Sequence, residues 1–113
     1  ETLFRDYEHE IARRVCTLGP SVVSTGGGML TFDRNGEILA KNGMIFYIDR
    51  PFEDCYSNLA QHPERPLFKN HTKKEVQDMY LIRRDLYRKY AKFDIKNTGT
   101  AGEAAEKICD LLK

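Results

Sequence analysis

The sequence predicts an α/β protein in which helices flank a parallel sheet. Residues Met44–Asp49 form an almost continuous apolar run, which is typical of strands that are buried on both faces of a parallel sheet. Segments with apolar residues at helical spacing alternate with such short runs along the chain. At 113 residues the chain is the length of one domain, which we expect to span residues 1–113.

The composition excludes several classes of protein. Lys and Arg number 18 and Asp and Glu 17, a balance that argues against general nucleic-acid binding. No apolar run approaches the roughly 20 residues of a membrane span, and no signal peptide is visible at the start. The three cysteines are widely spaced and read as reduced thiols. We therefore expect a cytoplasmic globular protein without a membrane or nucleic-acid partner.

The first half of the chain predicts a helix, a strand, a second helix and a second strand. One face of the first helix carries apolar residues at three- and four-residue spacing, namely Leu3, Tyr7, Ile11, Val15 and Leu18. Gly19-Pro20 ends this helix. The β-branched residues in Ser21–Thr25 favour a strand, which runs into Gly26–Gly28. A short helix over Gly36–Lys41 precedes the strand at Met44–Asp49.

The second half predicts three further helices, a loop and a third strand. Pro51 suits the first turn of a helix. The polar segment His62–His71 contains two prolines and has the length of a lid loop. Phe93–Lys96 is a short strand. Two capping boxes start the last two helices, and they are formed by Thr72 with Glu75 and by Thr100 with Glu103.

Three consecutive glycines follow the first expected strand. Glycine allows a ligand to approach backbone N–H groups closely. The carboxyl end of a strand is where open α/β sheets bind small anionic ligands. Gly26–Gly28 therefore indicate an anion-binding loop, with a flexible connection as the alternative interpretation.

Three arginines are candidates for binding an anionic substrate. Arg5 and Glu8 lie three residues apart on one helix face, as in an ordinary surface ion pair. Arg65 lies in the lid segment, from which it could reach a phosphate or remain in solvent. Arg83 lies beside the apolar position Ile82, where it could follow the core edge or belong to a charged surface.

Taken together, these patterns resemble the shikimate kinase family. That family carries Phe-Arg-x-x-Glu, a Gly-Gly-Gly strand end, Arg-Pro-Leu-Leu in its lid and Arg-x-x-Leu-Tyr on the next helix. Here the same order stands as Phe4–Glu8, Gly26–Gly28, Arg65–Phe68 and Arg83–Tyr87. The resemblance runs across the whole chain and is specific as a set, although each pattern alone is weak.

The resemblance implies a P-loop kinase-like fold and a reaction. The family transfers the γ-phosphate of ATP, with Mg²⁺, to the 3-hydroxyl of shikimate in the pathway to chorismate and the aromatic amino acids. By analogy, Arg5 and Arg83 bind the shikimate carboxylate and converge near Gly27.

The remaining site residues are carried over in the same way. Glu8 orients Arg5, and the backbone of Gly26, Gly27 and Gly28 meets the ring hydroxyls of shikimate. Arg65 closes on the ATP phosphates. Ser24 contacts Mg²⁺ through water.

Two departures from the family pattern stand out. Asn58 lies seven residues before Arg65, where many family members have an arginine that stacks on adenine. The family's phosphate loop, Gly-x-x-x-x-Gly-Lys-Ser/Thr, does not occur in these 113 residues, nor does the acidic residue that follows it. We expect both to precede Glu1, so that this chain lacks the N-terminal strand and phosphate loop of the fold. On this expectation the chain alone is inactive and forms a homodimer through its unpaired strand edges.

Two alternatives remain open from the sequence. One is another small-molecule P-loop kinase, such as a kinase for gluconate or nucleoside monophosphates. The other is a non-catalytic fragment that associates with itself.

Overall fold

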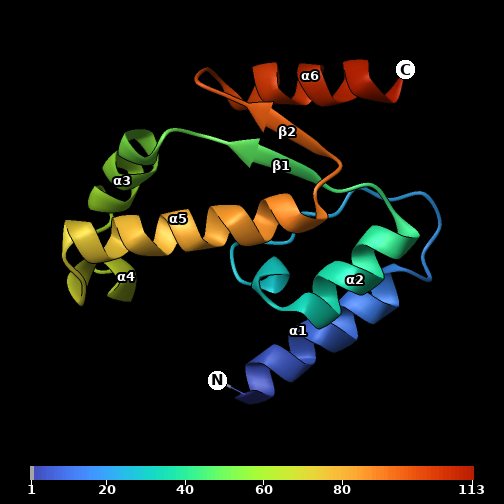
Figure 1. Ribbon diagram of the computed structural model, residues 1–113, viewed down its shortest axis with the longest axis horizontal. Coiled ribbons are helices and arrows are strands. Elements are labelled where there is room, and N and C mark those ends of the chain that lie inside the picture. Colours follow the sequence, from blue (N-terminus) through green and yellow to red (C-terminus); the bar gives the residue numbers. More distant parts are fainter. Residues whose placement is uncertain (1) are drawn as a thin grey trace.

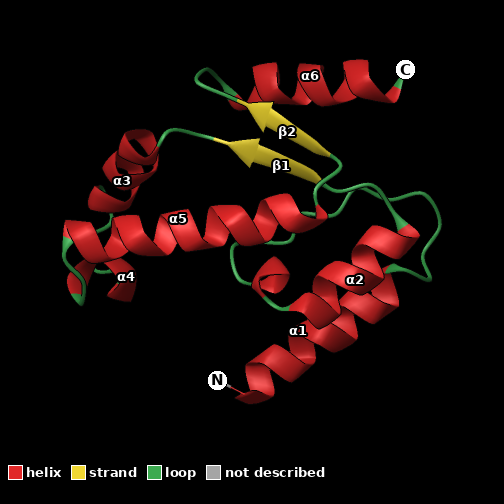
Figure 2. Cartoon of the chain, viewed as in Figure 1, coloured by secondary structure: helices red, strands yellow, loops and turns green. Residues whose placement is uncertain are grey.

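The computed structural model describes residues 2–113, and the two strands lie between α5 and α6 (Figures 1 and 2). α1 and α2 pack together at one end of the molecule, while α3 and α4 lie beside the start of α5 (Figure 1). The elements in chain order are α1 (Thr2–Val15), the 3-10 turn η1 (Met29–Thr31), α2 (Asp33–Asn42), β1 (Phe46–Asp49), α3 (Phe52–Ala60), α4 (Pro66–Lys69), α5 (Lys73–Tyr90), β2 (Phe93–Lys96) and α6 (Ala101–Leu112).

The predicted parallel sheet is confirmed by the pairing of β1 with β2. Phe46 lies opposite Phe93 at the start of the pair, and their rings stack with centroids 5.6 Å apart. Ile95 of β2 is 5% exposed, and β2 packs on α6. Ile48 of β1, which pairs with Ile95, is 46% exposed. Of these two paired residues, the one on β2 is therefore covered and the one on β1 is not.

The segment Ser21–Thr25 is not a strand, so that prediction is wrong. These residues have no regular structure, and Val22 is fully exposed. A β-branched sequence favours extended backbone, but a strand forms only when a neighbouring strand supplies hydrogen bonds. Within residues 2–113, the sheet consists of β1 and β2 alone.

Other element boundaries also differ from the predictions. The first helix ends at Val15 instead of Leu18, and α2 is longer than the expected Gly36–Lys41. The expected lid loop, His62–His71, contains the short helix α4. Its first residue is Pro66, whose fixed φ and missing N–H suit a helix start.

Both helices marked by threonine begin as predicted, but only Thr72 with Glu75 forms the full predicted capping box, whereas Thr100 forms one of its two bonds. The Thr72 hydroxyl accepts a hydrogen bond from the Glu75 backbone N–H at 3.1 Å, and the Glu75 carboxylate accepts one from the Thr72 N–H at 2.8 Å. The Thr100 hydroxyl accepts a hydrogen bond from the Glu103 N–H at 3.2 Å. These caps satisfy N–H groups that a helix start leaves without partners.

A buried asparagine connects the elements around the glycine loop. Asn35 of α2 is 1% exposed. Its Oδ1 lies 2.8 Å from His9 Nδ1 of α1, and its Nδ2 donates to the Met29 carbonyl at 2.9 Å. Because Oδ1 can only accept, His9 donates through Nδ1–H. Met29 follows the glycines directly, so this network fixes the end of the loop.

Arg88 attaches α5 to both strands. Its Nε donates to Asp94 of β2 at 2.7 Å, and its Nη2 donates to Asp49 of β1 at 3.1 Å. Tyr80, two turns earlier on α5, donates to the Arg50 carbonyl at 2.6 Å. These contacts set the position of α5 relative to the sheet.

None of the helices described within residues 2–113 has the length and apolar character needed to cross a membrane.

Candidate active site

Two arginines from different helices face the glycine loop, Gly26–Gly28. Arg83 Nη1 of α5 lies 3.3 Å from the position that a Cβ on Gly27 would take. A Cβ on Gly28 would overlap the guanidinium of Arg5, on α1. A side chain at Gly28 would therefore displace the Arg5 guanidinium, whereas one at Gly27 would press against that of Arg83.

The Arg5 guanidinium is held by an ion pair and by aromatic rings. Its Nη1 donates to Glu8 Oε1 at 2.8 Å, and both side chains are largely buried. Arg5 Cζ also lies 5.3 Å from the ring centroids of Phe4 and Phe32. Charge pairing together with contact on aromatic faces limits the orientations that the planar group can adopt.

Tyr87 connects the glycine loop to α5. Its hydroxyl donates a hydrogen bond to the Gly27 carbonyl. Burial raises the pKa of the Tyr87 phenol, whereas the neighbouring Arg83 guanidinium acts in the opposite direction with a smaller effect. The phenol therefore stays protonated at neutral pH and remains a donor.

A cavity of about 480 Å³ extends from Arg83 and Tyr87 to the lid segment. Arg65, at the start of α4, and Asn58 of α3 also line it. Its volume is that of pockets that bind small molecules. The structure therefore brings the lid arginine and the α5 arginine to one cavity, with Arg83 also reaching the glycine loop. Ser24 is exposed in the irregular segment before the glycines.

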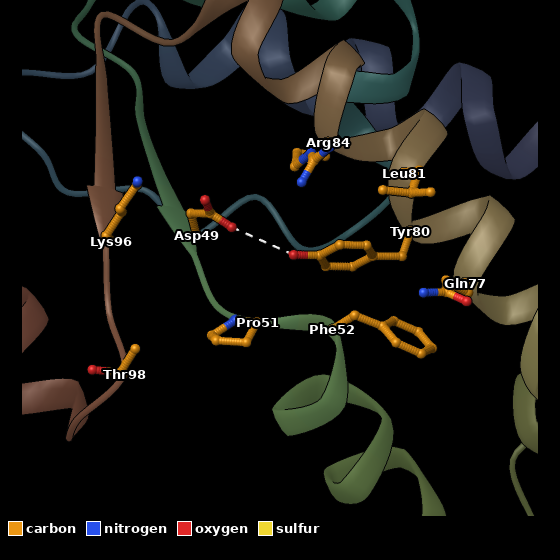
Figure 3. A pocket seen from close by; sticks show the side chains of 9 residues that line it. All are labelled: Asp49, Pro51, Phe52, Gln77, Tyr80, Leu81, Arg84, Lys96 and Thr98. Carbon is orange, nitrogen blue, oxygen red and sulfur yellow. Dashed lines mark hydrogen bonds between the residues drawn. The ribbon is translucent and has the colours of Figure 1, made fainter.

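A second cavity, of about 370 Å³, lies between α5 and the carboxyl ends of the two strands (Figure 3). Tyr80 crosses it toward Asp49, with 3.4 Å between the hydroxyl and Oδ1. Arg84 Nε is buried at its edge and has no hydrogen-bond partner in the described part of the chain. This cavity contains none of the predicted site residues, so the first cavity and the glycine loop form the candidate site.

Comparisons with known proteins agree on one family. The family model for shikimate kinase matches residues 1–113. The chain belongs to the shikimate kinase family. A shikimate kinase of Clostridium botulinum (strain Alaska E43 / Type E3) is 36% identical over 112 residues, which cover 99% of this chain and 67% of the relative. A shikimate kinase of Caldicellulosiruptor bescii is 34% identical over 112 residues, which cover 98% of this chain and 65% of the relative.

The solved structures give the same result for the fold. The structure of shikimate kinase from Acinetobacter baumannii in complex with shikimate matches this one with a TM-score of 0.87 and 31% sequence identity. The match covers 99% of this chain and 64% of the Acinetobacter chain. This chain therefore spans about two thirds of the length of the shikimate kinases that it matches.

Two residues of the candidate site were not assigned a place in it from the sequence. Phe32 lies four residues after the last glycine, and its contact with Arg5 depends on how η1 folds against α1. Tyr87 is the last residue of the Arg83–Tyr87 motif, but the neighbouring sequence does not show that its hydroxyl reaches Gly27. Its four-residue spacing from Arg83, which places both on one helix face, was the available signal.

We predict that Gly28→Ala in the full gene product weakens binding of shikimate by about tenfold or more, because the added methyl group displaces the Arg5 guanidinium. Calorimetric titration measures the affinity. The melting temperature should change little, since the displaced atoms lie at the end of a flexible side chain.

Gly19→Ala is the matched control for this prediction. A Cβ on Gly19 meets nothing within 4 Å, and its φ is not positive. Unchanged affinity in Gly28→Ala, or an equal loss in Gly19→Ala, would contradict the prediction.

Proposed function

We propose that the full protein transfers the γ-phosphate of ATP to the 3-hydroxyl of shikimate. The supporting observation is the meeting of Arg5 and Arg83 at a glycine loop, in a chain of the shikimate kinase family. Shikimate, which is bound in the structure of the Acinetobacter relative, carries one carboxylate and several hydroxyls. That combination suits two guanidinium groups beside exposed backbone.

In this proposal Arg5 and Arg83 bind the shikimate carboxylate. A planar guanidinium matches a carboxylate through two parallel hydrogen bonds. Glu8 keeps Arg5 oriented through the ion pair at 2.8 Å. The backbone of Gly26–Gly28, which carries no side chains, would then face the ring hydroxyls.

Arg65 acts on the nucleotide side of the reaction. It lies in the lid segment and lines the cavity that also holds Arg83. Phosphoryl transfer spreads negative charge over the transferred group, and an arginine placed beside it stabilises the transition state. We expect the β- and γ-phosphates of ATP to be held by a phosphate loop, a motif that these 113 residues do not contain. Asn58 lines the same cavity and takes the place of the adenine-stacking arginine of other family members.

Mg²⁺ would accompany ATP. This ion keeps several waters and is usually bound through substrate phosphates and one or two protein oxygens. Ser24 offers a single hydroxyl in the segment that leads into the glycine loop, which suits a water-mediated contact. Within residues 2–113, no three His, Cys, Asp or Glu side chains gather into a metal site.

We also place the protein in the cytoplasm, because its three cysteines are free thiols.

The test is a phosphorylation assay of the full gene product with ATP and, in parallel, shikimate, gluconate or a nucleoside monophosphate. We expect phosphorylation of shikimate alone. Arg83→Lys should raise the KM for shikimate by about tenfold or more and the KM for ATP by less than about twofold, because a point charge cannot reproduce bidentate binding.

Arg14→Lys is the matched control for this assay, since Arg14 is exposed and pairs with Glu10 far from the glycine loop. Turnover of gluconate or of a nucleoside monophosphate instead of shikimate would contradict the proposed function. Equal losses for shikimate and ATP in Arg83→Lys would contradict the assigned role of Arg83.

For residues 1–113 produced alone, we propose self-association without turnover. The edge of β1 opposite β2 has no strand partner within residues 2–113, and Ile48 and Val22 expose apolar surface. An unpaired strand edge of this kind is a template for pairing with a second chain. Light scattering should give twice the mass of one chain, and the phosphorylation assay should detect no turnover of shikimate. A stable monomer that phosphorylates shikimate would contradict both expectations.

A further inference from the structure

We propose that Tyr87 is a positioning residue, whose hydroxyl holds the glycine loop at a fixed place relative to Arg83. The inference rests on the proposed function for the identity of the ligand. The contacts that carry it are those of Tyr87 with Gly27 and with the sheet.

The glycine loop needs a restraint from outside its own backbone. Glycine has the greatest conformational freedom of all residues, and Gly26 adopts a φ of +72°. The segment before the loop is irregular and exposed. The end of the loop is held locally, because the Thr31 hydroxyl donates to the Gly28 carbonyl at 2.6 Å. Gly27 is held instead by Tyr87, from a helix about 60 residues later in the chain.

The Tyr87 side chain is itself fixed by the sheet. Its ring packs against Tyr47 of β1 with centroids 5.5 Å apart. The adjacent residue, Arg88, bonds to carboxylates on both β1 and β2. The position of the phenol oxygen is therefore set by the sheet and α5 together, and the bond transmits that position to Gly27.

Arg83 lies one helical turn before Tyr87 on the same face of α5. Its guanidinium reaches Gly27 directly, with 3.3 Å between Nη1 and the position of a Cβ. A ligand bound by Arg83 and by the loop backbone needs both at a fixed separation, which the Tyr87 hydroxyl sets. Without the hydroxyl, Arg83 stays on its helix while the loop samples other conformations, so that binding must order the loop first.

The experiment compares Tyr87→Phe with Tyr90→Phe in the full gene product. Both changes remove one hydroxyl and keep the ring. Tyr90 donates to Asp33 at the start of α2 instead of to the glycine loop, and serves as the matched control. Steady-state kinetics gives the KM for shikimate and for ATP, and ¹⁵N relaxation gives the order parameters of the Gly26 and Gly27 amides without ligand.

Tyr87→Phe should raise the KM for shikimate by about tenfold and leave the KM for ATP within about twofold, the size expected for one lost hydrogen bond at a site that needs it. The order parameters of the two amides should fall from rigid values to below about 0.6. Tyr90→Phe should change none of these quantities.

The proposal is overturned if Tyr87→Phe leaves the order parameters unchanged, or if it lowers only the melting temperature. It is also overturned if Tyr90→Phe gives the same changes. A gene product that does not phosphorylate shikimate contradicts the proposed function, while the order parameters still decide the role of Tyr87.

Discussion

The site depends on two guanidinium groups that lie against backbone without side chains. Glycine at positions 27 and 28 leaves room for Arg83 and Arg5, and a single methyl group on Gly28 would overlap Arg5. Two positive groups beside one loop repel each other unless negative charge accompanies them. Glu8 supplies it for Arg5, whereas Arg83 has no carboxylate ion pair among the described residues. An anionic ligand would balance the charge of Arg83. The carboxylate of the proposed substrate meets this requirement.

Two packed units carry the two arginines, and the glycine loop lies between them. Asn35 joins α1, η1 and α2 through His9 and the Met29 carbonyl, which fixes the helix that bears Arg5. Arg88 joins α5 to both strands, which fixes the helix that bears Arg83. η1 packs against α5, and the Tyr87 hydroxyl adds a direct bond across the junction. The separation of the two arginines is thus set by packing contacts that do not involve the ligand.

The parallel pairing of β1 with β2 and the strongest local signals were predicted correctly, whereas the strand at Ser21–Thr25 was not. The Thr72 capping box and the strand Phe93–Lys96 follow from adjacent residues and appear in the structure. Ser21–Thr25 has strand propensity, but within residues 2–113 no neighbouring strand binds it, and it remains irregular. The sequence patterns also indicated the residues that meet at the loop. The contacts of Phe32 with Arg5 and of Tyr87 with Gly27 require the tertiary arrangement, and the spacing of Tyr87 from Arg83 was the one local signal that pointed toward either of them.

We propose that the two arginines recognise the carboxylate of the substrate. The most direct measurement is calorimetric binding of shikimate and of its methyl ester to the full gene product and to Arg5→Lys. The ester has the same ring and hydroxyls but no negative charge. The wild-type protein should bind the ester about tenfold or more weakly than shikimate, and Arg5→Lys should reduce this difference. Equal affinity of the wild-type protein for the two compounds would contradict this proposal.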